Sequence, residues 1–166
     1  TTDRRYCDHG LMVTGAYLHG PLDDGVPPAR PYTTVDHYRI LDTDDGHQDA
    51  QLFKVLQRIQ DIVTGSGHDL YNLSVGPDVA IEDDEVHVWT STLDQLAASG
   101  KALLMVAAGN NGDRTQPLHR IQVPGDGVNV CCVGAADRRG AGWQRARYSA
   151  VGPGRRPGVV KPDVVA

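Results

Sequence analysis

The first residues that could do chemistry lie near the start of the chain, where His9 and Gly10 precede an apolar stretch. An imidazole titrates close to neutral pH, so a histidine at a rigid position can accept and return a proton as a general base and acid. A glycine beside it lets a backbone or a substrate approach closely. Taken alone, however, one histidine in such a segment is more often structural than catalytic.

A second group of candidate residues ends a buried strand predicted over residues 101–107. The run Ala107-Ala108-Gly109-Asn110 ends in a Gly-Asn pair, which predicts a turn. Parallel α/β sheets place ligand sites at the carboxyl ends of their strands, which is where this turn would lie. The side-chain amide of Asn110 is a donor of the type that stabilises an oxyanion during acyl transfer. By itself a Gly-Asn pair is a common turn signal.

A third group lies at the end of a strand predicted over residues 69–75. The run Asn72-Leu73-Ser74-Val75-Gly76 reaches the same edge of the expected sheet, because parallel strands present their carboxyl ends together. The strand therefore presents these residues beside the Gly-Asn turn.

The elements that must position these groups alternate between two hydrophobic periods. Apolar runs predict four short, mostly buried strands, over residues 35–41, 69–75, 101–107 and 128–133. Apolar residues at three- and four-residue steps predict two helices, over residues 49–63 and 85–99. This alternation predicts an α/β fold with a doubly wound, mostly parallel sheet flanked by helices.

Composition excludes several classes of protein. The 166 residues carry a net charge of −5, so phosphate-driven binding of nucleic acid is not expected. No apolar run approaches the roughly 18 residues that a membrane span requires. We expect no metal ligands, because the histidines and cysteines lack zinc-site spacing and Phe53 stands where a calcium loop over residues 42–53 would need its last glutamate.

Taken together and in chain order, these segments resemble the subtilisin-like serine peptidases, the subtilase family. His9-Gly10 with Val13 and Gly15 resembles the catalytic-histidine segment of the family. The run from Ala107 to Asn110 resembles the segment whose asparagine forms the oxyanion hole. Residues 72–76 resemble the family strand that pairs with the substrate backbone. Three further segments resemble family motifs, residues 123–137, 148–152 and 161–166. The resemblance covers almost the whole chain, so we expect residues 1–166 to be one partial peptidase domain, truncated at both ends.

The resemblance implies a serine endopeptidase that hydrolyses polypeptides without a cofactor. His9 would be the general acid and base, and Asn110 would be the oxyanion donor. The two walls of the substrate groove would be formed by six residues, Ser74, Val75 and Gly76 on one side and Ala107, Ala108 and Gly109 on the other. Structural calcium occurs in the family, but no ligand can be carried over to this sequence.

The resemblance also indicates that residues 1–166 do not include the aspartate and the serine of the catalytic triad. The family uses an Asp–His–Ser triad in that chain order, which puts the aspartate before His9 and the serine after Ala166. Asp3, Asp8 and Asp42 lack the position or the sequence context of the triad aspartate. We therefore expect residues 1–166 alone to be inactive, and to expose sheet edges that favour self-association.

Two other interpretations remain open. One is a catalytically inactive peptide-binding or regulatory module with the same fold, which is distinguished by whether a Gly-Thr-Ser sequence follows Ala166. The other is an unrelated doubly wound domain that binds a small ligand, although the chain has no Gly-rich dinucleotide or phosphate-binding motif. The sequence is compatible with both a secreted and a cytoplasmic protein.

Overall fold

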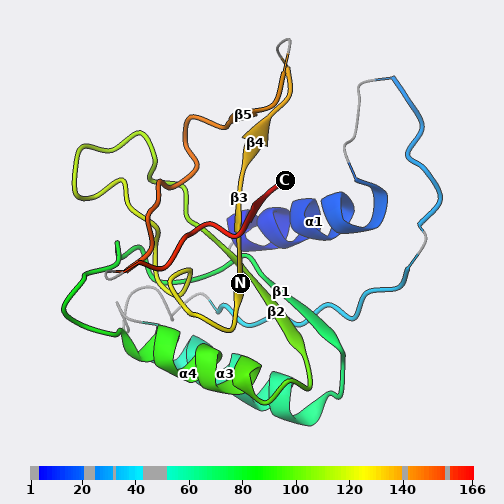
Figure 1. Ribbon diagram of the computed structural model, residues 1–166. Coiled ribbons are helices and arrows are strands. Elements are labelled where there is room, and N and C mark those ends of the chain that lie inside the picture. The colour runs from blue at the N-terminus through cyan, green and yellow to red at the C-terminus, as the bar shows by residue number, and fades with distance from the viewer. Residues whose placement is uncertain (1–3, 21–24, 32, 43–51, 140–141, 156–157) are drawn as a thin grey trace. The chain divides into compact units, whose positions relative to one another are not determined.

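The computed structural model describes residues 4–20, 25–31, 33–42, 52–139, 142–155 and 158–166 (Figure 1). The chain divides into two compact units, residues 1–55 and 56–166. The first three residues of the helix predicted over 49–63 lie outside the described part of the chain.

The first unit is built on the helix α1, Arg4–His19. Gly20, with a φ of 68°, follows the helix and donates its N–H to the carbonyl of Ala16, as is typical of a glycine that ends a helix. Two contacts tie the irregular segment that follows to α1. The hydroxyl of Thr14 lies 2.7 Å from Nδ1 of His37, and Nδ1 of His19 lies 2.8 Å from the carbonyl oxygen of Ala29.

The strand predicted over residues 35–41 is wrong. The segment is irregular, and residues 35–39 of it are exposed. A strand needs a neighbouring strand for its backbone N–H and C=O groups, and the described residues of the first unit contain no strand. The alternation of Val35 and Tyr38 with charged residues therefore has no sheet to join.

The second unit is built on a parallel sheet of four strands. They are β1 (Leu70–Leu73), β2 (Leu103–Ala107), β3 (Cys131–Gly134) and β6 (Val164–Val165), in the order β1-β2-β3-β6. Every neighbouring pair is parallel. The predicted α/β fold with a parallel sheet is confirmed, with strands somewhat shorter than the apolar runs.

The register of the strands gives the sheet one fully buried face. Tyr71 lies opposite Leu104, and Val106 lies opposite Cys132, and all four side chains are buried. Side chains alternate between the faces of a strand, so Leu103 points the other way and is 46% exposed, whereas Leu104 is 0% exposed. The core of the unit lies on the buried face.

Two helices complete the core. α4, Val88–Ala98, packs against β2 and buries Trp89 and Leu93 completely. α3 spans Phe53–Gly65, and the hydroxyl of Tyr71 donates to the carbonyl of Val63 near its end. Figure 1 shows both helices on one side of β1 and β2.

A small antiparallel hairpin follows β3. Its strands are β4, Ala136–Asp137, and β5, Gln144–Arg145. Arg139 donates two side-chain hydrogen bonds to Asp137, and this interaction lowers the pKa of Asp137 to about 2. Among the described residues, no helix is long and apolar enough to cross a lipid bilayer.

Candidate active site

Six of the predicted site residues lie where β1 and β2 end. Leu73, the last residue of β1, lies opposite Val106, so residues 74–76 leave the sheet beside residues 107–109. The two strands are parallel, and both segments therefore lie at the carboxyl edge, where α/β folds bind ligands. Within the described residues, the backbone groups of Val75 and Gly76 make no hydrogen bond. They are available to an extended chain.

A third segment, residues 121–123, joins these two strand ends. Gln122 donates its backbone N–H to the carbonyl of Ala108 at 2.8 Å. On its other side, Val123 donates to the carbonyl of Val79 at 3.0 Å, and Ile81 donates to that of Ile121 at 2.9 Å. The loop after β1 and the loop after β2 are thus hydrogen bonded to the same short segment.

Gly76 and Gly109 lie so close to residues 122–123 that no larger residue fits at either position. A Cβ on Gly76 would lie 2.6 Å from the carbonyl oxygen of Val123, which is closer than real Cβ contacts. Gly109 has a φ of 115°, and a Cβ there would overlap with the side chain of Gln122. Both residues belong to the predicted groove walls, and each leaves room for another part of the chain.

Asn110, the predicted oxyanion donor, follows Gly109 at this edge and is exposed. Its backbone N–H donates to Oε1 of Gln122 at 3.1 Å. An exposed carboxamide on a backbone that is held in this way can present a donor to an approaching carbonyl group.

The next residue, Asn111, is buried and is 1% exposed. Its Nδ2 donates to the carbonyl of Arg120 at 2.8 Å and also to that of Leu118. Its Oδ1 has no hydrogen-bond partner among the described residues. The backbone N–H of Gly112 donates to the carbonyl of Tyr148 at 2.8 Å. These bonds hold the start of the loop over residues 109–127.

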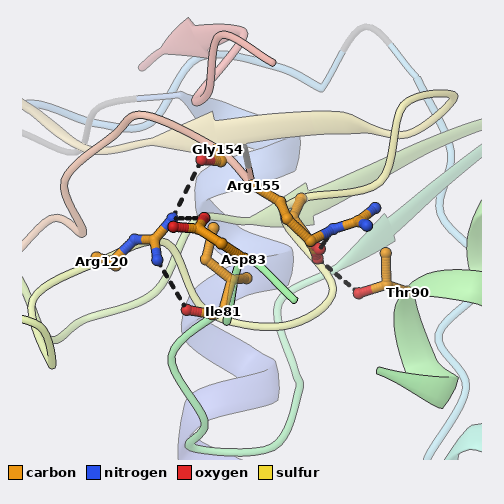
Figure 2. Close-up of polar contacts among 7 residues, drawn as sticks. Ile81, Asp83, Thr90, Arg120, Gly154 and Arg155 are labelled. Atoms are coloured by element: carbon orange, nitrogen blue, oxygen red, sulfur yellow. Dashed lines mark hydrogen bonds and ion pairs between the residues drawn. The ribbon is translucent and has the colours of Figure 1, made fainter. Parts of the chain in front are cut away.

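Charged side chains hold the rest of that loop, as Figure 2 shows. The guanidinium of Arg120 donates to Asp83 at 2.7 Å, and also to the carbonyls of Ile81 and Gly154 at 3.3 Å and 3.2 Å. Because Arg120 and Asp83 are both partly buried, this ion pair is shielded from solvent more than a surface pair.

The end of the loop contains a buried carboxylate. Asp126 is 2% exposed, and it accepts hydrogen bonds from the hydroxyl of Thr90 at 2.6 Å and from Nε of Arg155 at 3.2 Å. A buried charge is costly unless it is paired and hydrogen bonded, and here both oxygens have a donor. The loop is therefore attached to α4 and to the segment before β6.

His9 lies in α1 and is exposed. It belongs to the first unit, whereas the other seven predicted site residues belong to the second. A Cβ on the adjacent Gly10 would lie 3.1 Å from Cε1 of His37, so this turn of α1 is close to the irregular segment of its own unit. The structure brings together the seven residues of the second unit, and the catalytic role of His9 stays a prediction.

Sequence reasoning missed four residues that hold this edge, Asp78, Asn111, Arg120 and Gln122. Each acts through a contact between irregular segments, and neither hydrophobic periodicity nor motif spacing signals such a contact. In the part of the chain that the structure describes, no group of three histidine, cysteine, aspartate or glutamate side chains could hold a metal ion.

Comparison with solved structures finds related proteases. The structure titled "Structure of Prenylagaramide maturation protease PagA" is 26% identical with a TM-score of 0.46, and the match covers 60% of this chain and 32% of that one. "Structure of self-cleaved protease domain of PatA" is 28% identical with a TM-score of 0.43, over 57% and 32% of the two chains. "S41 Psychrophilic Protease" is 26% identical with a TM-score of 0.40, over 64% and 33%.

The chain thus matches about a third of the length of these proteases, 32% of PagA and PatA and 33% of the S41 protease. No curated protein matches it. The family model described as "Subtilase family" matches residues 2–166, which is nearly every residue of both units. The chain belongs to the subtilase family of serine peptidases.

Proposed function

We propose that the protein containing this chain is a subtilisin-type serine endopeptidase in which His9 is the general acid and base and Asn110 is an oxyanion donor. The observation that carries the proposal is the arrangement at the carboxyl edge of β1 and β2. There the backbone of Val75 and Gly76 is unpaired within the described residues, and Asn110 is exposed beside it. Family membership over residues 2–166 supports the reaction class.

The proposed substrate is an extended polypeptide. It would form backbone hydrogen bonds with residues 74–76, as a strand added to an existing edge. Residues 107–109 would form the opposite wall of the groove. Such pairing recognises any backbone, so the side chains that line the two walls would set the sequence preference.

The proposed reaction is acyl transfer to a serine hydroxyl. The serine oxygen attacks the carbonyl carbon of the scissile peptide bond while His9 accepts the hydroxyl proton. The oxyanion that forms accepts a hydrogen bond from the side-chain amide of Asn110. His9 then gives its proton to the leaving amine, and water releases the acyl group by the same steps.

The triad is not completed by residues 1–166 in this proposal. The family order puts the aspartate, which orients the imidazole, before His9, and the nucleophilic serine after Ala166. Residues 1–166 alone are therefore expected to hydrolyse no peptide.

The test is intact-mass analysis of the full-length protein with a fluorophosphonate, which labels an activated serine. We expect one adduct in the natural protein and none in His9→Ala. His19→Ala is the matched control, because His19 ends the same helix, and it should keep the adduct. Asn110→Ala should lower turnover by about 10²–10³, the loss known for removing one oxyanion donor in subtilisin.

Two results would contradict the proposal. An adduct that persists in His9→Ala would remove the histidine from the mechanism. No adduct in a folded full-length protein would favour the catalytically inactive peptide-binding module instead, with the strand edge used for recognition alone.

A further inference from the structure

The side chain of Gln122 lies against the turn that carries Asn110. Its Oε1 accepts the backbone N–H of Asn110 at 3.1 Å, and its own backbone N–H donates to the carbonyl of Ala108 at 2.8 Å. One residue therefore binds the turn on both sides of Gly109. No family motif that the sequence displays includes this position.

The orientation of the Gln122 carboxamide is set by Asp78. An ionised carboxylate can only accept hydrogen bonds, and Oδ1 of Asp78 accepts from Nε2 of Gln122. The amide group must therefore face Asp78, which leaves Oε1 facing Asn110.

Arg114 forms an ion pair with Asp78 on the side away from Gln122. Nη2 of Arg114 lies 2.9 Å from Oδ2 of Asp78, and this hydrogen bond lowers the pKa of Asp78. The side chains of Arg114 and Gln122 both donate to Asp78, and the backbone N–H of Asn110 donates to Gln122. These hydrogen bonds connect Arg114 to the turn at Asn110.

The steric fit at Gly109 supports the same arrangement. Gly109 has a φ of 115°, and a Cβ on it would overlap with Cγ, Cδ and Oε1 of Gln122. The Gln122 side chain therefore occupies the space that any other residue at position 109 would need. The glycine at position 109 therefore lets the Gln122 side chain lie directly against the turn.

We propose that Gln122 is a positioning residue that holds the backbone of Asn110, so that the Asn110 side-chain amide meets the developing oxyanion at a fixed place. The inference rests on the function proposed above. A donor aimed at transition-state charge is effective only when it is held in place beforehand. Loss of Gln122 should therefore lower kcat and leave KM unchanged, because the groove walls at residues 74–76 and 107–109 remain.

The test compares four variants of the full-length protein. Gln122→Met keeps the length of the side chain and removes both hydrogen bonds. Gln122→Glu keeps an acceptor for Asn110 but places a second carboxylate against Asp78. The double variant Gln122→Glu with Asp78→Asn restores a donor facing an acceptor, with the roles of the two residues exchanged. Gln95→Met makes the same substitution at an exposed position of α4 and is the control.

We expect kcat to fall about 10-fold in Gln122→Met and in Gln122→Glu at constant KM, since a small displacement of a catalytic donor costs up to about 10²-fold. The double variant should recover most of the loss, and Gln95→Met should match the natural protein. Undiminished kcat in both single variants, or a double variant no better than Gln122→Glu, would overturn the inference.

Amide hydrogen exchange is measured on the natural protein. It therefore depends neither on catalytic activity nor on whether a variant folds. The N–H of Asn110 should exchange more slowly than an unbonded exposed amide, and exchange at the unbonded rate would overturn the inference. A natural protein that hydrolyses no peptide would overturn the proposed function. An active protein whose Gln122 variants keep full kcat would overturn only the role of Gln122.

Discussion

The helix that carries His9 and the loop that carries Asn110 are held in different ways. In α1 the backbone groups are bonded within the helix, and its surface is open: Leu11 is 73% exposed, and a Cβ on Gly15 would meet no atom within 4 Å among the described residues. In the loop over residues 109–127, Asn111 and Asp126 are buried, and a Cβ on Gly112 would overlap with the backbone of Ser149.

The difference follows from how backbone groups find partners. A helix satisfies its N–H and C=O groups internally, apart from its ends, so most single changes on an open face cost little. An irregular loop must take its partners from other segments. The loop around Asn110 therefore depends on individual residues far away in the sequence, whereas α1 depends mainly on being helical.

The largest expected effect is that of Gly112→Ala. The new methyl group would overlap with the carbonyl of Ser149, and the free energy of unfolding should fall by about 4–5 kcal/mol, at the extreme of single substitutions. Gly15→Ala in α1 is the matched control and should raise it by about 0.5–1 kcal/mol, since alanine suits a helix better. Thermal unfolding of the full-length protein measures both, and equal melting temperatures would contradict the comparison.

A medium effect is expected from Leu93→Ala in α4. Leu93 is 0% exposed, and removing buried methyl groups leaves a cavity that costs about 2–5 kcal/mol. The same substitution at the exposed Leu11 of α1 should change the free energy of unfolding by less than about 0.5 kcal/mol. Urea unfolding separates the two outcomes, and similar losses at both positions would show that the exposed face of α1 is buried in the full-length protein.

The smallest expected effect is a difference in how readily the thiols of Cys7 and Cys132 are alkylated. Burial raises the pKa of Cys132 to about 12, from an ordinary value of 9.0, whereas Cys7 in α1 is exposed. Alkylating agents attack the thiolate, so iodoacetamide at about pH 8 should label Cys7 and spare Cys132. Peptide mass mapping measures this, and rapid labelling of Cys132 would show that β3 opens readily.

The same pKa predicts the alkaline stability. Because the folded-state pKa of Cys132 is raised, its contribution to stability is complete below about pH 9 and is lost as the pH rises toward 12. Cys132→Ala should lack this part of the decline.

Much of the fold could be predicted from the sequence, because buried parallel strands and amphipathic helices carry strong patterns. The run over residues 101–107 contains β2, and the stripe over 85–99 contains α4. Residues 35–41 show the limit of that reasoning. Their apolar residues resemble a strand, but a strand forms only where a second strand can pair with it.

The candidate site could be predicted in part. The ends of the predicted parallel strands placed Asn110 and residues 74–76 at one edge, and the structure has them there. The sequence pattern could not supply Gln122 or Arg120. The contact of Gln122 with Asn110 lies within one irregular loop, and the contact of Arg120 with Asp83 joins two irregular segments. Such contacts depend on side-chain geometry in three dimensions, which the sequence pattern does not encode.

The hydrogen bond from Gly112 to Tyr148 also bears on the chemical ageing of the protein. An Asn-Gly sequence loses ammonia spontaneously when the glycine nitrogen attacks the asparagine side-chain carbonyl and closes a succinimide ring. Here that nitrogen lies 2.8 Å from the carbonyl oxygen of Tyr148, and the Asn111 amide is bonded to Arg120. Ring closure therefore requires the loop to open first, so the rate at which Asn111 becomes aspartate and isoaspartate during storage records how often this loop unfolds.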